Sequence, residues 1–251
     1  MRPISGSRIG DWSNTVRVVS AYEDEFTDNV SNWKIRRTTF INEVNGFYEN
    51  SQNGFGHSWY VIRIEDPRDW GIASPLVEAP APPYAIEYRI QTPQPGNLIS
   101  AGAIFGGDWN GVPEPAGCIN YSTLETVYQH TDCFNRFYFA NIILHNGVKM
   151  LFERVDQLVW CPTCTGSPMK RFGDIGSSNE VTLPGLNPAD FNTYRYEVRA
   201  DGIKVFVNGT QRFTYSDLRY LDQPYFGIGA TTDEYSNSTW RIDYYRVTPL
   251  D

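Results

Sequence analysis

The chain has 251 residues, enough for one domain with a sizeable hydrophobic core. Its formal net charge of −8 argues against a nucleic-acid partner, because neutralising phosphates requires clustered lysine and arginine, and its 21 basic residues are scattered. No apolar run approaches the about 20 residues that a membrane-spanning helix needs, so we expect no membrane insertion.

The composition favours an exported β-protein. Aromatic residues make up 15% of the chain, which suits half-buried pleated surfaces. The first residues lack the apolar core of a signal peptide, so the chain either acts where it is made or is a mature or excised form. The composition favours the second interpretation and an extracellular or cell-surface location.

We expect residues 1–20 to form an N-terminal arm and residues 21–251 to form a single domain. Directly after the arm, Glu23, Asp24, Glu25 and Asp28 surround one aromatic residue, Phe26. Like charges at this spacing repel each other, so the turn requires either open water or a cation.

The middle of the chain alternates between strands and apparent loops. Residues 84–91 place Tyr and Ile on one face and mainly polar residues on the other, which predicts a strand. The Pro-rich residues 65–83 and the stretch 160–180 are interpreted as long loops. Residues 137–145 predict a strand that turns at Asn146-Gly147 into a second strand.

The C-terminal third repeats the hairpin signal. Turns are predicted at Asp201-Gly202 and Asn208-Gly209, because these pairs tolerate the positive φ angles of tight hairpins. A glycine-spaced strand at 225–230 and a closing strand at 239–247 follow. About a dozen short strands predict an all-β fold in which two antiparallel sheets stack as a β-sandwich.

Three segments resemble the concanavalin A-like lectin/glucanase superfamily, whose members include laminarinase-like and LamG-like jelly rolls. They are the opening DEFTDNVSNW, the hairpin YRYEVRADGIKVFVNGTQ and the closing RIDYYRV. The resemblance implies a jelly roll whose first and last strands lie side by side. It says less about function, because this fold hosts many activities.

The resemblance also implies a structural calcium ion, held by Glu25, the carbonyl of Gly46 and Asp243. Calcium accepts such mixtures of carboxylate and carbonyl oxygens. The alternative is a solvated acidic turn, with Asp243 paired to Arg241 or Arg246.

The glycosidases of this superfamily carry the motif Glu-x-Asp-x-x-Glu on one strand, and this chain lacks it. The corresponding strand, 137–145, offers only Asn141 and His145 as polar groups on one face. We therefore predict no catalytic residues, although acids that converge on Asn141 and His145 in the folded protein would support an enzyme.

The four cysteines, Cys118, Cys133, Cys161 and Cys164, favour disulfides in an exported chain. Pairing in sequence order is one of three connectivities, and a zinc site is the alternative.

Tryptophan is the residue most suited to stacking on a sugar. Trp33, Trp59 and Trp240 follow strand rhythm and are predicted to be core, whereas Trp70, Trp109 and Trp160 are predicted in loops. Trp109, flanked by Asp108 and Asn110, is the first candidate for a ligand contact, and Trp70 and Trp160 come next.

The leading hypothesis is a non-catalytic carbohydrate-binding or adhesion module with a polysaccharide or glycan as its partner. The second is a structural surface protein, such as an appendage or virion subunit, that binds other copies of itself or domains of a larger chain. The third is a hydrolase or lyase with an unfamiliar site.

Overall fold

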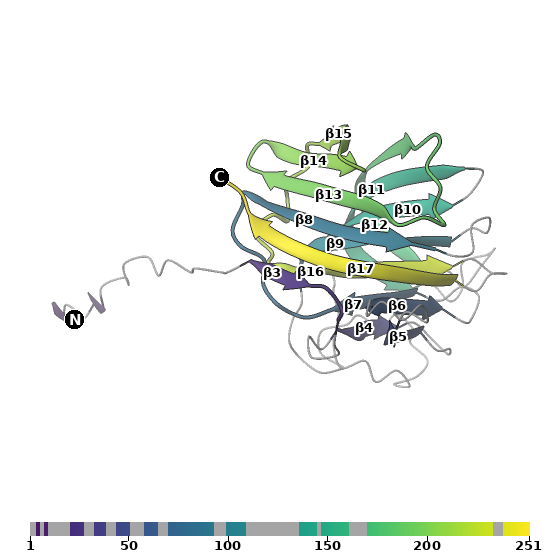
Figure 1. The fold of residues 1–251 in the computed structure, drawn as a ribbon. Coiled ribbons are helices and arrows are strands. Elements are labelled where there is room, and N and C mark those ends of the chain that lie inside the picture. Colours follow the sequence, from purple (N-terminus) through teal and green to yellow (C-terminus); the bar gives the residue numbers. More distant parts are fainter. Residues whose placement is uncertain are drawn as a thin grey trace.

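The computed structural model describes most of the chain, and its described residues form two stacked antiparallel sheets without a helix (Figure 1). The described ranges are 4–5, 8–9, 21–27, 33–38, 44–50, 58–64, 70–92, 99–108, 136–144, 147–160, 170–232 and 238–251. The all-β sandwich predicted from the sequence is confirmed.

One sheet has seven strands. In spatial order these are β12 (Lys170–Thr182), β11 (Val148–Trp160), β10 (Phe137–Leu144), β9 (Ile99–Gly107), β16 (Tyr225–Thr232), β7 (Trp70–Ser74) and β4 (Lys34–Thr38).

The other sheet has eight strands. Their order is β15 (Thr210–Tyr215), β14 (Gly202–Val207), β13 (Asn192–Arg199), β8 (Tyr84–Gln91), β17 (Ser238–Pro249), β6 (Ser58–Ile64) and β5 (Val44–Asn50), with β3 (Tyr22–Asp24) beside β17. The short strands β1 (Ile4–Ser5) and β2 (Arg8–Ile9) pair with each other.

The predicted hairpins form where the turn residues indicated. Asn208 and Gly209 have φ angles of 49° and 75°, as the tight turn between β14 and β15 requires. The Asn208 side chain also accepts a hydrogen bond from the backbone N–H of Thr193 at 2.9 Å. This contact ties the turn to the neighbouring strand β13.

The pairing of the chain ends is likewise confirmed. Strand β3 pairs with β17, with Asp24 opposite Tyr245. The first and last strands of the sandwich therefore lie side by side, as the jelly-roll resemblance implied (Figure 1).

The two long loops were predicted wrongly. Residues 65–83 contain β7, and residues 160–180 contain most of β12. Strand β12 is rich in Gly, Ser and charged residues, which have low intrinsic strand propensity. It is a strand because it pairs along almost its whole length with β11, from Lys149–Thr182 to Trp160–Lys170. Pairing with a neighbouring strand thus overrides local propensity.

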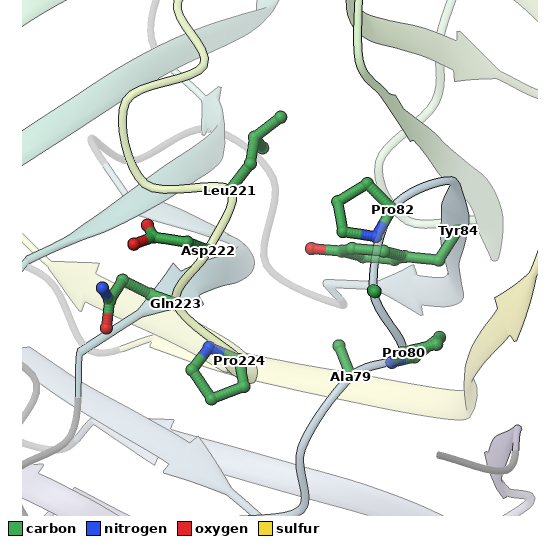
Figure 2. Close-up of a pocket in the computed structure, with 9 residues that line it drawn as sticks. Ala79, Pro80, Pro82, Tyr84, Leu221, Asp222, Gln223 and Pro224 are labelled. Carbon is green, nitrogen blue, oxygen red and sulfur yellow. The ribbon is translucent and has the colours of Figure 1, made fainter. Parts of the chain in front are cut away.

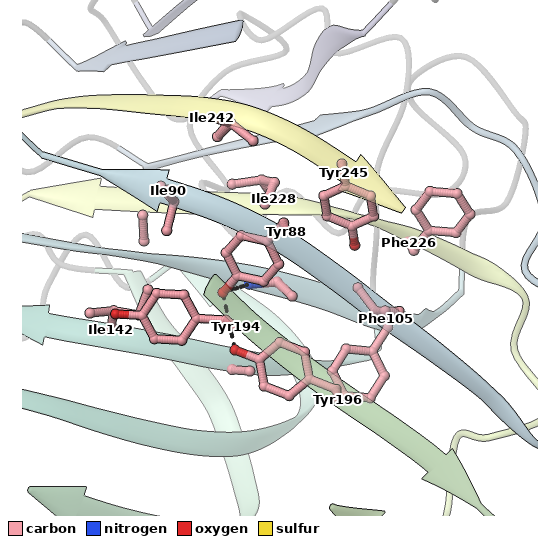
Figure 3. Close-up of a cluster of buried hydrophobic side chains, with 14 of the residues drawn as sticks. Tyr88, Ile90, Phe105, Ile142, Tyr194, Tyr196, Phe226, Ile228, Ile242 and Tyr245 are labelled. Carbon is pink, nitrogen blue, oxygen red and sulfur yellow. Dashed lines mark hydrogen bonds between the residues drawn. The ribbon is translucent and has the colours of Figure 1, made fainter. Parts of the chain in front are cut away.

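The core between the sheets is built around stacked tyrosines (Figure 3). The ring of Tyr88 lies 5.6 Å from Tyr194, 6.0 Å from Tyr196 and 5.8 Å from Tyr245. The hydroxyls of Tyr88 and Tyr196 are 3.0 Å apart, and the Ala103 N–H donates to the Tyr88 hydroxyl at 3.2 Å. Each hydroxyl is thus partnered despite full burial, as a stable core requires.

Trp33 and Trp240 lie in this core, as predicted, with 3% and 1% of their surface exposed. The prediction was wrong for Trp59, which is half-buried on the outward face of the eight-stranded sheet. Its ring lies 6.2 Å from Phe191, and the Arg241 guanidinium lies 5.5 Å above it. Alternation along β6 places Tyr60 and Ile62 inward and Trp59 outward. The strand was therefore predicted correctly, but Trp59 was assigned to the wrong face.

Candidate functional site on the seven-stranded sheet

The outward face of the seven-stranded sheet carries two buried polar residues, Asn141 and Glu153, on neighbouring strands. In β10, Tyr138, Ala140, Ile142 and Leu144 belong to the core between the sheets. Because successive side chains alternate, the other residues of β10 point away from that core. These are Phe137, Phe139, Asn141 and Ile143.

The register of three neighbouring strands brings Asn141 together with two acids. Asn141 lies opposite Leu151 of β11, and Leu151 lies opposite Glu180 of β12. Glu153 lies opposite Phe139 and is therefore the diagonal neighbour of both Asn141 and Glu180. Diagonal neighbours on antiparallel strands are about 7–8 Å apart, within reach of long side chains.

Burial divides this face into two parts, a floor and a rim. The floor is closed: Phe137, Phe139 and Val155 are fully buried, together with Ile72 and Ile104 of neighbouring strands. Gly229 makes this packing possible, because a Cβ there would lie 2.9 Å from Ile104 and 3.0 Å from the Phe139 ring.

The rim consists of Ile143, Lys149, Leu151 and Glu180 and is open to solvent. The first three are half-buried and Glu180 is exposed. Lys149 Nζ donates to Glu180 Oε1 over 2.9 Å. Asn141 and Glu153 lie where the open rim meets the closed floor, and each is 5% exposed.

Glu153 is a buried acid, and burial disfavours its ionised form. It forms no hydrogen bond or ion pair with any described residue, and desolvation by burial raises its pKa from 4.5 to about 7. At neutral pH this carboxyl group therefore holds its proton about half of the time. The sequence alone does not single out Glu153, because only the strand register places it beside Asn141.

Asn141 has a complementary feature. Its Oδ1 is buried and has no hydrogen-bond partner within the described part of the chain. A buried acceptor without a partner costs about 1–3 kcal/mol, so such a group calls for an explanation, and a bound water, ion or ligand is one. The sequence placed Asn141 on one face of its strand together with His145, and His145 lies outside the described residues, so that pairing stays a prediction.

The remaining ligand candidates do not gather at this face. Asp108 pairs with Arg136 at 3.1 Å. Trp70 begins β7 and Trp160 ends β11, so neither lies in a loop, contrary to the prediction. Trp109, Asn110, Asp28 and the four cysteines Cys118, Cys133, Cys161 and Cys164 lie outside the described residues, and the predictions about them stand untested.

The acidic turn is held by arginine and by its own backbone. Asp24 accepts a hydrogen bond from the Phe26 N–H at 2.8 Å, which stabilises the positive φ angle of 51° at Phe26. Arg246 of β17 pairs with both Glu23 and Glu25. Like-charge repulsion in the turn is thus relieved by a cation that the chain itself supplies.

The two carboxylates predicted as calcium ligands each pair with an arginine. Glu25 is bound by Arg246, and Asp243 is bound by Arg89 at 2.9 Å. Gly46 lies on β5 opposite Ile62. No three acidic, His or Cys residues of the described ranges form a metal-binding group. Calcium would therefore have to displace both arginines, and the calcium site stays a prediction.

The described residues include no helix that is long and apolar enough to cross a membrane.

Comparison with known proteins identifies the fold. No protein-family model matches the chain, and no curated protein matches it in sequence. Solved structures do match across most of its length. A β-glucanase of Bacillus licheniformis has a TM-score of 0.53 at 12% identity, covering 93% of this chain and 100% of that chain.

Two further structures have similar scores. A laminarinase from Flavobacterium sp. UMI-01 has a TM-score of 0.51 at 14% identity, covering 90% of this chain and 98% of its own. The carbohydrate recognition domain of Emp46p has a TM-score of 0.52 at 14% identity, covering 90% of this chain and 93% of that domain's chain. The chain therefore has the concanavalin A-like jelly-roll fold, which glucanases and carbohydrate recognition domains share. At these identities the likeness establishes the fold alone.

Proposed function

We propose that this protein is a carbohydrate-binding jelly roll that holds a glycan on the outward face of the seven-stranded sheet. The observation that carries the proposal is the buried, unpartnered Oδ1 of Asn141 at the edge of an open, partly polar surface. A sugar hydroxyl lying over the rim would donate a hydrogen bond to this oxygen and remove its desolvation cost.

The rim suits a neutral polysaccharide. Ile143 and Leu151 offer apolar contacts to the C–H groups of a sugar ring, while Lys149 and Glu180 offer a donor and an acceptor for hydroxyls. Such a mixture of apolar surface with a few convergent polar groups is typical of small-molecule sites. The aromatic partner expected at Trp109 would add a stacking surface.

The leading form of the proposal is binding without catalysis, outside the cell. The glycosidase motif of this fold is absent from the sequence, and the net charge, aromatic content and four cysteines suit an exported protein.

A second candidate, glycoside hydrolysis, is favoured by the pair Glu153 and Glu180. Glu153 holds a proton near neutral pH, whereas Glu180 is exposed and paired with Lys149. Inverting glycosidases use a protonated acid and an ionised base on opposite sides of the scissile bond, and the register places Glu153 and Glu180 at diagonal positions on one sheet face. In this reading Glu153 donates its proton to the leaving oxygen, and Glu180 activates a water.

Isothermal titration of purified protein with soluble β-glucans and mucin-type oligosaccharides tests the first proposal. Asn141→Ala should weaken binding about tenfold, the equivalent of about 1.4 kcal/mol. Its thermal stability should not fall, because the lost oxygen has no partner and its burial is costly. The matched control is Asn187→Ala, which makes the same truncation in an exposed turn and should bind as the unaltered protein does.

Reducing-sugar release from the bound glycan separates the two candidates. A binding protein releases none. A hydrolase releases sugar in a manner that Glu153→Gln abolishes, and Glu180→Gln should also abolish it. Absence of binding to all glycans, with large assemblies in light scattering, would contradict both candidates and favour a structural surface protein.

A further inference from the structure

A cavity lies away from the seven-stranded sheet face, at the end of the sandwich where β17 finishes. It has a volume of about 190 Å³ and opens between two connecting segments, 79–82 before β8 and 221–224 before β16 (Figure 2). This volume far exceeds the about 10–15 Å³ that one water needs. A small organic molecule would fit.

Backbone hydrogen bonds hold the two walls in place. The Ala79 N–H donates to the Pro224 carbonyl at 2.8 Å, and the Leu250 N–H donates to the Pro83 carbonyl at 2.9 Å. Glu78 and Tyr225, directly beside the cavity, form a β-bridge. Because these bonds fix both segments to each other and to the C-terminal strand, the cavity is preformed.

Tyr84 points its hydroxyl into this cavity (Figure 2). The side chain is 99% buried, since 1% of its surface is exposed, yet its hydroxyl forms no hydrogen bond with a described residue. Among the other core tyrosines, Tyr88, Tyr138 and Tyr245 have hydrogen-bond partners for their hydroxyls, whereas Tyr194 has none among the described residues. Tyr84 differs from Tyr88, Tyr138 and Tyr245 because its hydroxyl faces the cavity and has no hydrogen-bond partner among the described residues.

The lining selects the chemistry of a ligand. Pro80 and Pro82 on one wall and Pro224 on the other have no N–H to donate and present C–H groups to the space, while Asp222 and Gln223, on the same wall as Pro224, direct their side chains away from Tyr84 (Figure 2). None of the described lining residues is basic, so an anionic ligand is disfavoured, as it is by the net charge of −8. The Tyr84 hydroxyl can both donate and accept a hydrogen bond, and with the apolar lining around it this matches a hydroxyl on a carbon ring.

We infer that this cavity is a binding site for a single neutral sugar ring, whose hydroxyl pairs with the Tyr84 hydroxyl. It would be separate from the site around Asn141, so that one chain could hold a glycan at two places. The inference stands on the cavity itself and does not need the proposed function of the sheet face.

Saturation-transfer NMR of the full chain with neutral monosaccharides tests the inference. The panel contains glucose, galactose, mannose and N-acetylgalactosamine, with tetramethylammonium as the cationic probe. A sugar signal is expected for the unaltered protein and for Asn141→Ala. In Tyr84→Phe, which removes only the unpartnered hydroxyl, the affinity should fall about tenfold while the melting temperature stays the same or rises. Ala81→Trp, a substitution at an exposed lining residue, should fill the cavity and abolish the signal.

Four results would overturn the inference. The first is the absence of a sugar signal in the unaltered protein and in every variant, which would mean that the cavity holds only water. The second is a signal from tetramethylammonium alone. The third is unchanged sugar affinity in Tyr84→Phe, and the fourth is a large loss of stability in that variant, since it would mean that the hydroxyl has a structural partner. Loss of the signal in Asn141→Ala but not in Tyr84→Phe would assign the sugar to the sheet face and support only the proposed function.

Discussion

Replacing Glu153 by Gln should make the protein more stable at alkaline pH. Glu153 is 5% exposed and has no partner among the described residues, and burial raises its pKa from 4.5 to about 7. One pKa unit corresponds to about 1.4 kcal/mol, so ionising this carboxyl costs the folded state about 3 kcal/mol more than the unfolded state. Gln keeps the shape and removes the ionisation.

The sign of the pH dependence follows from proton uptake. Between pH 4.5 and about 7 the folded protein holds the Glu153 proton and the unfolded chain has lost it. The contribution of Glu153 to stability is therefore highest at or below about pH 4.5, falls as pH rises through 7, and levels off above that. At pH 8.5 Glu153→Gln should exceed the unaltered protein by up to about 3 kcal/mol, and at pH 4.5 the two should be nearly equal.

Urea unfolding at pH 4.5, 6, 7 and 8.5 measures this difference. In a thermal unfolding experiment, the same difference of about 3 kcal/mol would shift the melting temperature of a chain of this size by roughly 6–12 °C, well above experimental error. The control is Glu180→Gln, which makes the same substitution at an exposed acid that lies diagonally from Glu153 on the neighbouring strand β12. A difference between Glu153→Gln and the unaltered protein that stays constant with pH would refute the reasoning, because it would mean that the carboxyl is solvated or partnered.

Three further predictions concern other parts of the sandwich. Arg154 is 4% exposed and pairs with Asp217, so Arg154→Met leaves a partly buried carboxylate without that partner. Chemical denaturation should show that the free energy of unfolding falls by about 3 kcal/mol. A fall of less than about 1 kcal/mol would contradict this prediction. Gly209→Ala should destabilise by about 1 kcal/mol, since φ is 75° there, and an unchanged denaturation midpoint would argue against the tight turn. If the predicted calcium site exists, calcium at about 100 times its Kd should raise the stability of chelator-treated protein by about 2.7 kcal/mol, and Asp243→Asn should abolish the effect. No change in melting temperature with calcium would instead leave Arg89 and Arg246 as the cations at that position.

The parts of the fold that the sequence predicted are those encoded locally. The alternation in residues 84–91 and the Asn-Gly and Asp-Gly pairs report directly on the strand and on the turns, so β8 and the C-terminal hairpins were found. Strands β7 and β12 were missed because their own residues carry little strand signal, and neighbouring strands stabilise them.

The candidate site was predicted in part for a related reason. Asn141 could be assigned to an outward face from parity within one strand. Glu153 could not be added to it, because the relation of β11 to β10 depends on their register, which a sequence does not state. The acidic turn shows the same limit: its charge repulsion was evident, but the arginine that relieves it is 221 positions away from Glu25.

The most direct test of the account is a glycan array that compares the unaltered protein with Asn141→Ala and Asn187→Ala. We expect binding to at least one glycan, unchanged by Asn187→Ala and weakened about tenfold by Asn141→Ala. Glycan binding that Asn141→Ala leaves intact would place the ligand elsewhere and contradict the assignment of this sheet face, and a complete absence of binding would contradict the carbohydrate-binding function itself.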